Sequence, residues 1–251
     1  EKFLEENLAA KLFVGFALTD NIPDHTVLCR ARGRIGTSLL SKIFQDLRKQ
    51  LQEKGLINGA FNFVDASSLI AKANLWKERD LSIRKKFDKL NNKILPKVAC
   101  DKEARIGCKG NKKFWYGYKK HVNVDMASGL ITKVAITPAN VPDSKGFKNV
   151  CPSGGIIFAD KAYCGKQCQK ESLINGCDLA AIKKNNMKGK NKDQDRYRSR
   201  MRSPFERVFS KQRKRTRYMG VVKNQFSGFM ESLCFNLKRL LVLNIEGLCL
   251  N

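Results

Sequence analysis

The chain has 251 residues, which is enough for one large domain or two small ones with a buried core. Its 49 Lys and Arg exceed its 23 Asp and Glu and give a formal net charge of +26, an excess typical of a protein that binds a polyanion, most often nucleic acid. No apolar run reaches the roughly 18 residues of a membrane span, and the nine Cys and two His fit no usual zinc spacing, so we expect reduced thiols in a cytoplasmic protein without a membrane partner.

A small helical region is expected over residues 1–58. Apolar residues at helical spacing predict one helix over residues 1–19. Pro23 then ends one element, and Asp24 can cap the next. We expect this region to bind DNA or to form a dimer contact, and the start at Glu1, without a Met, leaves room for a missing upstream segment.

A second helix is predicted over residues 37–54. Its N-cap is expected at Thr37 or Ser38, because a short hydroxyl side chain there can accept from the first backbone N–H groups. The apolar stripe that predicts the helix consists of Leu39, Leu40, Ile43, Phe44, Leu47 and Leu51. Two glycines, Gly55 and Gly59, mark its end.

After residue 58 the pattern changes to strands. Alternation in AFNFVDAS (residues 60–67) predicts a strand that ends at Asp65. FWYGYKKHVNVDM and LITKVAITPA are two β-rich runs around ASG, which indicates a hairpin. GGIIFADKAYCG predicts a short strand that ends at Asp160 and is followed by a helix.

The last third of the chain predicts helix, strand and two more helices. QKESLINGCDLAAIKK favours a helix and then a strand. A basic loop over residues 185–198 precedes the helix that carries Glu206, and residues 224–245 form a final amphipathic helix. The order over residues 59–251 is that of an α/β domain, a mixed sheet with flanking helices.

Three acids each have a structural explanation when they are taken alone. SPFE at residues 203–206 is a capping box, with Ser203 as N-cap and Glu206 three residues later. Asp65 and Asp160 end apolar strands, where an Asp often caps a turn. The ends of sheet strands are also where α/β proteins place active-site groups, so both interpretations stand for each acid alone.

Taken together, the three acids favour a metal site. Three converging carboxylates repel one another, and a cation removes that cost. Mg²⁺ prefers oxygen ligands and open water positions, which Asp65, Asp160 and Glu206 would leave. Two such ions, with Mn²⁺ able to substitute, are suited to phosphodiester chemistry, because one activates the attacking oxygen and the other stabilises the leaving oxygen.

Other chemistry-bearing residues favour structural roles. Asp125 and Asp143 lie at turn signals, and His25 and His121 have no second His nearby in the sequence. The aromatic residues of the first hairpin strand could stack on bases, although in an alternating run they are more often core; these are Trp115, Tyr116 and Tyr118.

Several stretches resemble insertion-sequence transposases of the DDE type, in the group headed by insertion sequence five and related to the insertion-sequence-four type. They occur in the family's order over roughly residues 20–245, which makes the resemblance specific. The stretches are IPDHTVLCRAR, FVDASS, YGYKKHVNVDMASGLITKVAITPANVPDS, FADKAYCG and RSPFERVFSKQR.

The resemblance implies an RNase H-like fold with Asp65, Asp160 and Glu206 as catalytic and metal-binding residues. Related families carry the pattern Tyr-x2-Arg-x3-Glu-x6-Lys, and here Arg202 and Glu206 fit it, while Ser199 replaces the Tyr and Arg213 the Lys. The basic residues around Glu206 are expected to bind DNA phosphates; they are Arg202, Arg207, Lys211, Arg213 and Lys214.

The activity implied by the resemblance is that of a DNA transposase. It would cut at the terminal inverted repeats with Mg²⁺ and transfer the strand into target DNA, as a homodimer or larger assembly associated with the nucleoid. Two alternatives stay open: an inactive or truncated relic that only binds DNA, and an RNase H-like nuclease without strand transfer.

Overall fold

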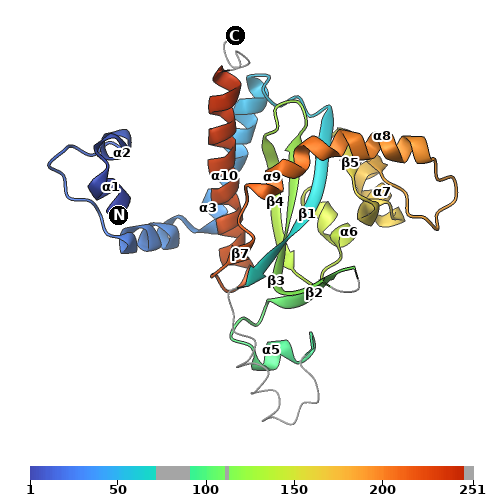
Figure 1. Cartoon of the computed structure of the whole chain (residues 1–251), viewed down its shortest axis with the longest axis horizontal. Coiled ribbons are helices and arrows are strands. Elements are labelled where there is room, and N and C mark those ends of the chain that lie inside the picture. The colour runs from blue at the N-terminus through green and yellow to red at the C-terminus, as the bar shows by residue number, and fades with distance from the viewer. Residues whose placement is uncertain (72–90, 111–112, 246–251) are drawn as a thin grey trace.

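The computed structural model of the chain describes residues 1–71, 91–110 and 113–245 (Figure 1). The strands are β1 (Phe61–Ala71), β2 (Arg105–Lys109), β3 (Lys113–Asp125), β4 (Ile131–Pro138), β5 (Gly155–Ala159), β6 (Cys177–Ala181) and β7 (Arg215–Thr216). The α-helices are α1 (Lys2–Glu6), α2 (Leu8–Phe13), α3 (His25–Glu53), α5 (Leu95–Val98), α6 (Asp143–Gly146), α7 (Lys166–Ile174), α8 (Lys192–Arg202), α9 (Arg207–Ser210) and α10 (Val221–Ile245). Short 3₁₀ turns are η1 (Phe147–Asn149), η2 (Lys161–Tyr163) and η3 (Ser203–Glu206).

The strands form one mixed sheet in the order β2-β3-β1-β5-β6, with β4 paired to β3 and β7 paired to β1. The pairs made by β3 with β1, β2 and β4 are antiparallel, whereas β5 is parallel to both β1 and β6. The β3–β4 hairpin is connected by residues 126–130, which include the ASG signal at residues 127–129, as predicted. The predicted α/β fold, a mixed sheet with flanking helices and a helical N-terminal region, is confirmed.

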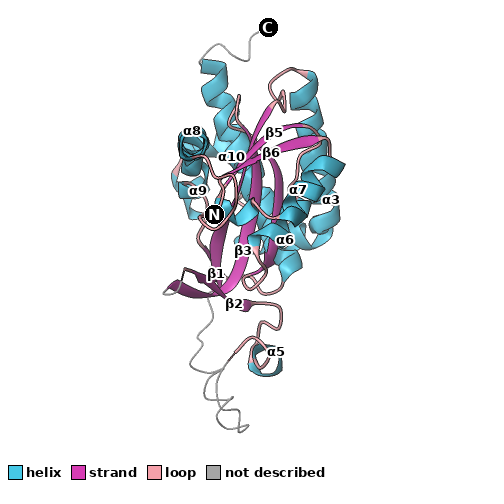
Figure 2. Cartoon of the chain, turned by 90° about the vertical axis from the view of Figure 1, so that its right-hand side faces the viewer, coloured by secondary structure: helices cyan, strands magenta, loops and turns pink. Residues whose placement is uncertain are grey.

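The core is divided between the two faces of the sheet. Phe63 and Val64, successive residues of β1, are both fully buried because each face is covered. On one face Phe63 packs with side chains from α3, α9 and α10; on the other, Val64 packs with side chains from η1, η2 and α7. Figure 2 shows α8 and α9 on one side of the strands and α6 and α7 on the other.

Strand β1 is longer than the alternation predicts. Residues 66–71 continue the strand beyond Asp65, because Ala66 to Ile70 pair with β3 and Ile70 to Ala71 pair with β7. The prediction that the strand ends at Asp65 is therefore wrong. Asp65 lies inside β1, at the point where the parallel neighbour β5 ends.

The helical region differs from prediction at two points. Residues 1–19 form two short helices and not one, because Asn7 is extended and its side chain accepts from Ala10 N at 2.9 Å. The predicted second helix is the latter half of α3, which begins at His25 with Asp24 as its side-chain cap, as expected. Non-helical Gly36 (φ 66°) divides α3, and Thr37 donates to Val222 O (3.2 Å), so the predicted cap at Thr37 or Ser38 is wrong.

The latter half of α3 packs into the sheet domain. Its Leu40 and Phe44 lie in the same apolar cluster as Phe63 of β1. The ring centroids of Phe44 and of Phe229 in α10 are 5.5 Å apart. The division of the chain at residue 58 stays a prediction. No helix in the described ranges has the length and apolarity needed to cross a bilayer.

The cysteines of the described residues are all free thiols, as the composition predicts. Four lie buried on the face that α7 covers: Cys151, Cys164, Cys168 and Cys177. Four are exposed: Cys29, Cys100, Cys108 and Cys234. Cys249 lies outside the described residues.

Candidate active site

Asp65 and Asp160 are brought together by the parallel pairing of β1 with β5. In that register Val64 lies opposite Ala159, and each aspartate is the next residue of its chain segment. Because neighbouring strands lie about 4.8 Å apart, the two backbones hold these carboxyl groups side by side. The pairing explains how residues 95 positions apart in the sequence reach one site.

Glu206 is the last residue of η3, the short turn that connects α8 to α9. The predicted basic loop over residues 185–198 is wrong in its latter part, because residues 192–202 are the helix α8, capped by the Asn191 side chain. The predicted capping box is also wrong: Ser203 is helical and η3 has no side-chain cap hydrogen bond. Capping therefore does not explain Glu206.

The three acids surround the guanidinium of Arg202. Its Nη2 lies 3.7 Å from Asp65 Oδ2 and 3.8 Å from Glu206 Oε1, and its Nη1 lies 3.5 Å from Asp160 Oδ1. The side chain of Arg202 is 8% exposed, whereas those of Asp65, Asp160 and Glu206 are 25%, 41% and 60% exposed. One buried cation thus faces three carboxylates, whose exposure to solvent increases from Asp65 through Asp160 to Glu206.

Arg202 is held in this position by aromatic packing. Its guanidinium carbon lies 5.7 Å from the centroid of the Phe63 ring. Phe205 and Phe209 pack against the same ring at centroid distances of 6.1 and 6.2 Å. Arg202 Nε is buried without a hydrogen-bond partner, so the side chain is fixed by its charge and its packing.

Burial raises the pKa of Asp65 to about 6. The hydrogen bond from Ala66 N and the charge of Arg202 both lower this pKa, and the charge of Asp160 raises it further. The guanidinium therefore compensates the buried carboxylate only in part. An additional positive charge at this position would stabilise the ionised form of Asp65.

The donors at this site suit a hard divalent cation, since all of them are carboxylate oxygens. Their present spacing leaves no closed cage: within the described ranges, the one group of three or more Asp, Glu, His or Cys whose ligand atoms all lie within 4.8 Å of one another is the exposed set Glu1, Asp24 and His25. At the candidate site the Arg202 guanidinium lies between the acids instead. A cation could be bound jointly by Asp65, Asp160 and Glu206 once the Arg202 side chain has moved away from them.

Tyr163 is a residue of the site that sequence reasoning missed. Its ring is fully buried in η2 and packs against Phe147 at a centroid distance of 5.8 Å. Burial, followed by the charges of Asp65 and other nearby acids, raises its pKa well above the ordinary value. Its hydroxyl has no hydrogen-bond partner among the described residues. The signal was its place three residues after Asp160, one 3₁₀ turn away.

The other basic residues expected to bind DNA follow Glu206 along one surface. Arg207, Lys211, Arg213 and Lys214 are all exposed, unlike Arg202. The segment runs from Glu206, beside Asp65, to Arg215, which pairs with Ile70. It therefore follows β1 for five residues, or about 16 Å. We call Arg207, Lys211, Arg213 and Lys214 the basic track.

A pocket of about 180 Å³ lies at the far end of the basic track, lined by Arg213, Arg215 and Arg217. In its wall the buried ammonium of Lys120 pairs with Glu231. Tyr197, one turn before the Arg202 site, packs edge-on against Phe158 at 6.5 Å, and Ser199 is exposed on α8.

The rival acids and aromatic residues have structural partners. Asp125 accepts from Gly59 N at 3.0 Å and from Ser128 N at 2.9 Å, which ties the hairpin to the start of β1. Asp143 pairs with Lys119 at 2.8 Å. Tyr116 and Tyr118 are buried in the core, and both hydroxyls donate to Asp101.

Two comparisons with known proteins found similar chains. One solved structure with a similar chain is described as a cryo-EM structure of the piggyBac transposase synaptic complex with hairpin DNA, with a TM-score of 0.47 and 11% identity. The match covers 90% of this chain and 55% of that one, so the chain spans about half the length of that protein. The sequence model of the family described as Transposase DDE domain matches residues 75–239, a range that holds Asp160 and Glu206 and begins shortly after Asp65. Since that match covers well over half of the chain, the protein belongs to the transposase DDE domain family.

Proposed function

We propose that the protein is a DNA transposase that cuts DNA at the inverted-repeat ends of its element with Mg²⁺ and joins the freed 3′-OH to target DNA. The observation that carries the proposal is the convergence of Asp65, Asp160 and Glu206 on one guanidinium. Membership of the transposase DDE family supports the same reaction class. We place the protein in the cytoplasm, on the DNA of the nucleoid.

The three carboxylates would hold the cations. Two Mg²⁺ ions, or Mn²⁺ in their place, would supply an activated attacking oxygen and a stabilised leaving oxygen. Asp65 and Asp160 set the spacing, because backbone pairing fixes them on neighbouring segments. Glu206, the most exposed of the three, would complete the ligand set from η3. Arg202 competes for the same oxygens and offsets part of their negative charge in the absence of metal.

The basic track would hold the DNA beside these acids. Arg207 follows Glu206 directly and Lys211 lies four residues further on, so a phosphate bound by them would lie near the carboxylates. Binding of double-stranded DNA, at the element ends and at the target, is part of the proposal. Because two ends must be joined, we expect a homodimer or a larger assembly.

The test is cleavage of a labelled duplex that carries the element's own end, with Mg²⁺ and with EDTA. Asp65→Asn, Asp160→Asn and Glu206→Gln should each lower cleavage on the order of a thousandfold. All three should still bind the duplex, measured by fluorescence anisotropy. Asp178→Asn is the matched control, because this acid is exposed on β6, away from the site.

The outcomes separate the proposal from its alternatives. Full cleavage by all three variants would exclude the metal site. Binding without cutting by the wild type, in Mg²⁺ and in Mn²⁺, would identify a relic that only binds DNA. Cutting without joined products, when target DNA is supplied, would identify a nuclease without strand transfer.

A further inference from the structure

A second pocket, of about 250 Å³, lies at the other end of the sheet from the carboxylates. Asn62 near the start of β1 and Gly155 at the start of β5 line it, whereas Asp160 follows the end of β5. Gly155 and Asp160 are five residues apart, about 16 Å along an extended strand, and Asn62 and Asp65 are three residues apart on β1, about 10 Å. The pocket is therefore distinct from the candidate active site.

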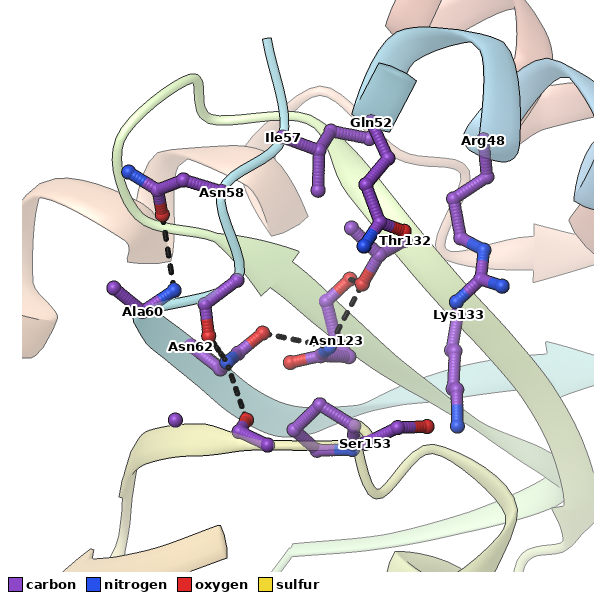
Figure 3. A pocket seen from close by; sticks show the side chains of 14 residues that line it. Arg48, Gln52, Ile57, Asn58, Ala60, Asn62, Asn123, Thr132, Lys133 and Ser153 are labelled. Atoms are coloured by element: carbon purple, nitrogen blue, oxygen red, sulfur yellow. Dashed lines mark hydrogen bonds between the residues drawn. The ribbon is translucent and has the colours of Figure 1, made fainter. Parts of the chain in front are cut away.

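Two cations and no carboxylate are found among the described residues that line this pocket. Arg48 reaches it from α3 and Lys133 from β4, and Figure 3 shows the two side chains on the same side of the pocket. Arg48 Nε is buried and has no hydrogen-bond partner in the described part of the chain, and Lys133 donates to Cys151 O. Like charges in this arrangement repel, and nothing anionic in the lining compensates them.

The Asp125 carboxylate, which is bound to the pocket residue Gly59, accepts three hydrogen bonds and makes no ion pair with Arg48 or Lys133 among the described residues. Asp125 accepts from Gly59 N with one oxygen and from the backbone and hydroxyl of Ser128 with the other. Burial, followed by the charge of Arg48, lowers the pKa of Lys133. The ammonium thus lacks a counter-charge that an anionic ligand would provide.

The remaining walls combine polar side chains and glycines with a few apolar residues, Ile57, Ala60 and Pro152. Asn123, 1% exposed, has an amide oxygen without a partner, and its nitrogen donates to Asn62 and Thr132 (Figure 3). Gly155 (φ 77°) allows two backbones to meet, since a Cβ there would lie 2.1 Å from Gly59 O. The floor at this point is backbone, without a side chain to exclude a ligand.

We propose that this pocket binds a phosphate group through Arg48 and Lys133. A guanidinium pairs with phosphate through two parallel N–H donors, and an ammonium adds a point charge. The volume is below the roughly 300–1,000 Å³ of pockets for drug-sized ligands, which fits a phosphate with at most an adjoining sugar. The same chemistry occurs in the backbone of a DNA strand and in free phosphate or a nucleotide, and the experiment separates these sources.

The first measurement is the thermal unfolding of the wild type in sodium phosphate and in sodium chloride of equal ionic strength. Binding to the folded state should raise Tm by a few degrees in phosphate. Arg48→Gln with Lys133→Gln should remove this rise. The matched control, Lys49→Gln with Lys148→Gln, removes two exposed cations outside the pocket and should keep it.

The second measurement is the salt dependence of binding to a fluorescein-labelled DNA duplex. If a backbone phosphate occupies the pocket, the slope of log K against log salt should become shallower by about 0.9 in the pocket variant. The control pair is then the reference for the loss of two charges. An unchanged slope, together with the phosphate-specific rise in Tm, would identify free phosphate or a nucleotide as the ligand.

Two results together would overturn the proposal. The Tm of the wild type would be no higher in phosphate than in chloride, and the pocket variant and the control pair would show the same slope of log K against log salt. Should the double variant fail to fold, Arg48→Gln alone gives the same comparison. These readouts do not involve cleavage, so they stand or fall independently of the proposed transposase activity.

Discussion

The buried positive charge of Arg202 faces three carboxylates, so its removal should lower the stability of the folded protein. Arg202→Gln should lower the free energy of unfolding in EDTA by about 2 kcal/mol, less than the 3–5 kcal/mol of a fully buried pair because Asp160 and Glu206 are partly exposed. Mg²⁺ should restore more stability to the variant than to the wild type, because it can replace the lost cation. Urea unfolding with EDTA and with Mg²⁺ measures both effects.

The control for this prediction is Arg200→Gln, which removes an exposed arginine from the same helix. It should change the free energy of unfolding by a few tenths of a kcal/mol. If Arg202→Gln were as stable as this control in EDTA, Arg202 would not serve as the internal counter-ion of the three acids.

His121 gives the protein a defined loss of stability in acid. It is fully buried, with Nε2 2.8 Å from Thr137 Oγ1 and Nδ1 unpartnered, and it lies near Asp143 and Lys119. Burial lowers its pKa to about 4, which the charge of Asp143 opposes and that of Lys119 assists. In the unfolded chain an ordinary pKa of about 6.5 applies.

Between pH 6.5 and 4 the unfolded state therefore binds a proton that the folded state does not. The stability from neutral His121 is complete above the unfolded pKa and is lost as the pH falls, by on the order of 3 kcal/mol at pH 4. Chemical unfolding across this range should show the loss in the wild type and in His25→Asn, whose histidine is exposed. A wild-type profile as flat as that of His121→Asn would contradict the assignment.

At the scale of elements, the pairing of β1 with β3 depends on Gly117. Its φ is 145°, and a Cβ there would lie 2.3 Å from Leu69 O and 2.6 Å from Ala71 N. Gly117→Ala should lower the free energy of unfolding by about 2–4 kcal/mol, because the strand that carries Asp65 must shift. Gly33→Ala, with open space around it in α3, should be neutral or slightly stabilising. Equal stability of both variants in urea would show that the backbones adjust freely.

Two strands, β5 and β1, differ in how far their extent could be predicted from the sequence. The strand into Asp160 was predictable, because IIFA is buried from both sides and reads as a continuous apolar run. The continuation of β1 was not, since Ser67 and Ser68 look like a turn until β3 supplies their pairing partners, Lys119 and Lys120.

Helix α8 was not predicted, because its sequence also lacks the main local signal for the structure that it forms. Its sequence, KDQDRYRSRMR, is almost entirely polar, so there is no apolar stripe from which to infer a helix. The Asn191 cap and its neighbours Asp193 and Asp195 in the first turn are the signals that were available. The position of Arg202 among the three acids could not be inferred without this helix.

For the molecule as a whole, the net charge of +26 predicts steep salt dependence of DNA binding. A protein that contacts 6–10 phosphates loses roughly 10³–10⁵ in affinity between about 50 and 200 mM salt. Replacing the basic track by Gln should make the slope of log K against log salt shallower by about 3–4. Anisotropy titrations at several salt concentrations measure this slope.

A charge-matched control for this prediction replaces four exposed lysines elsewhere: Lys42, Lys49, Lys148 and Lys170. It lowers the net charge equally and should change the slope much less. If both sets of substitutions changed the slope equally, DNA binding would depend on the net charge of the protein and not on the four residues of the basic track.

The division of the thiols between surface and core has a consequence for the chemistry of the intact chain. Burial raises the pKa of Cys151 to about 12 and that of Cys168 to about 11, so at neutral pH almost no thiolate is present at either sulfur. Alkylating reagents and oxidants react with thiolates, and they will modify Cys29, Cys100, Cys108 and Cys234 first. Modification of the buried set requires the β5–β6 side of the sheet to open, and its rate is therefore a chemical measure of how often the strand that positions Asp160 comes apart from its neighbours.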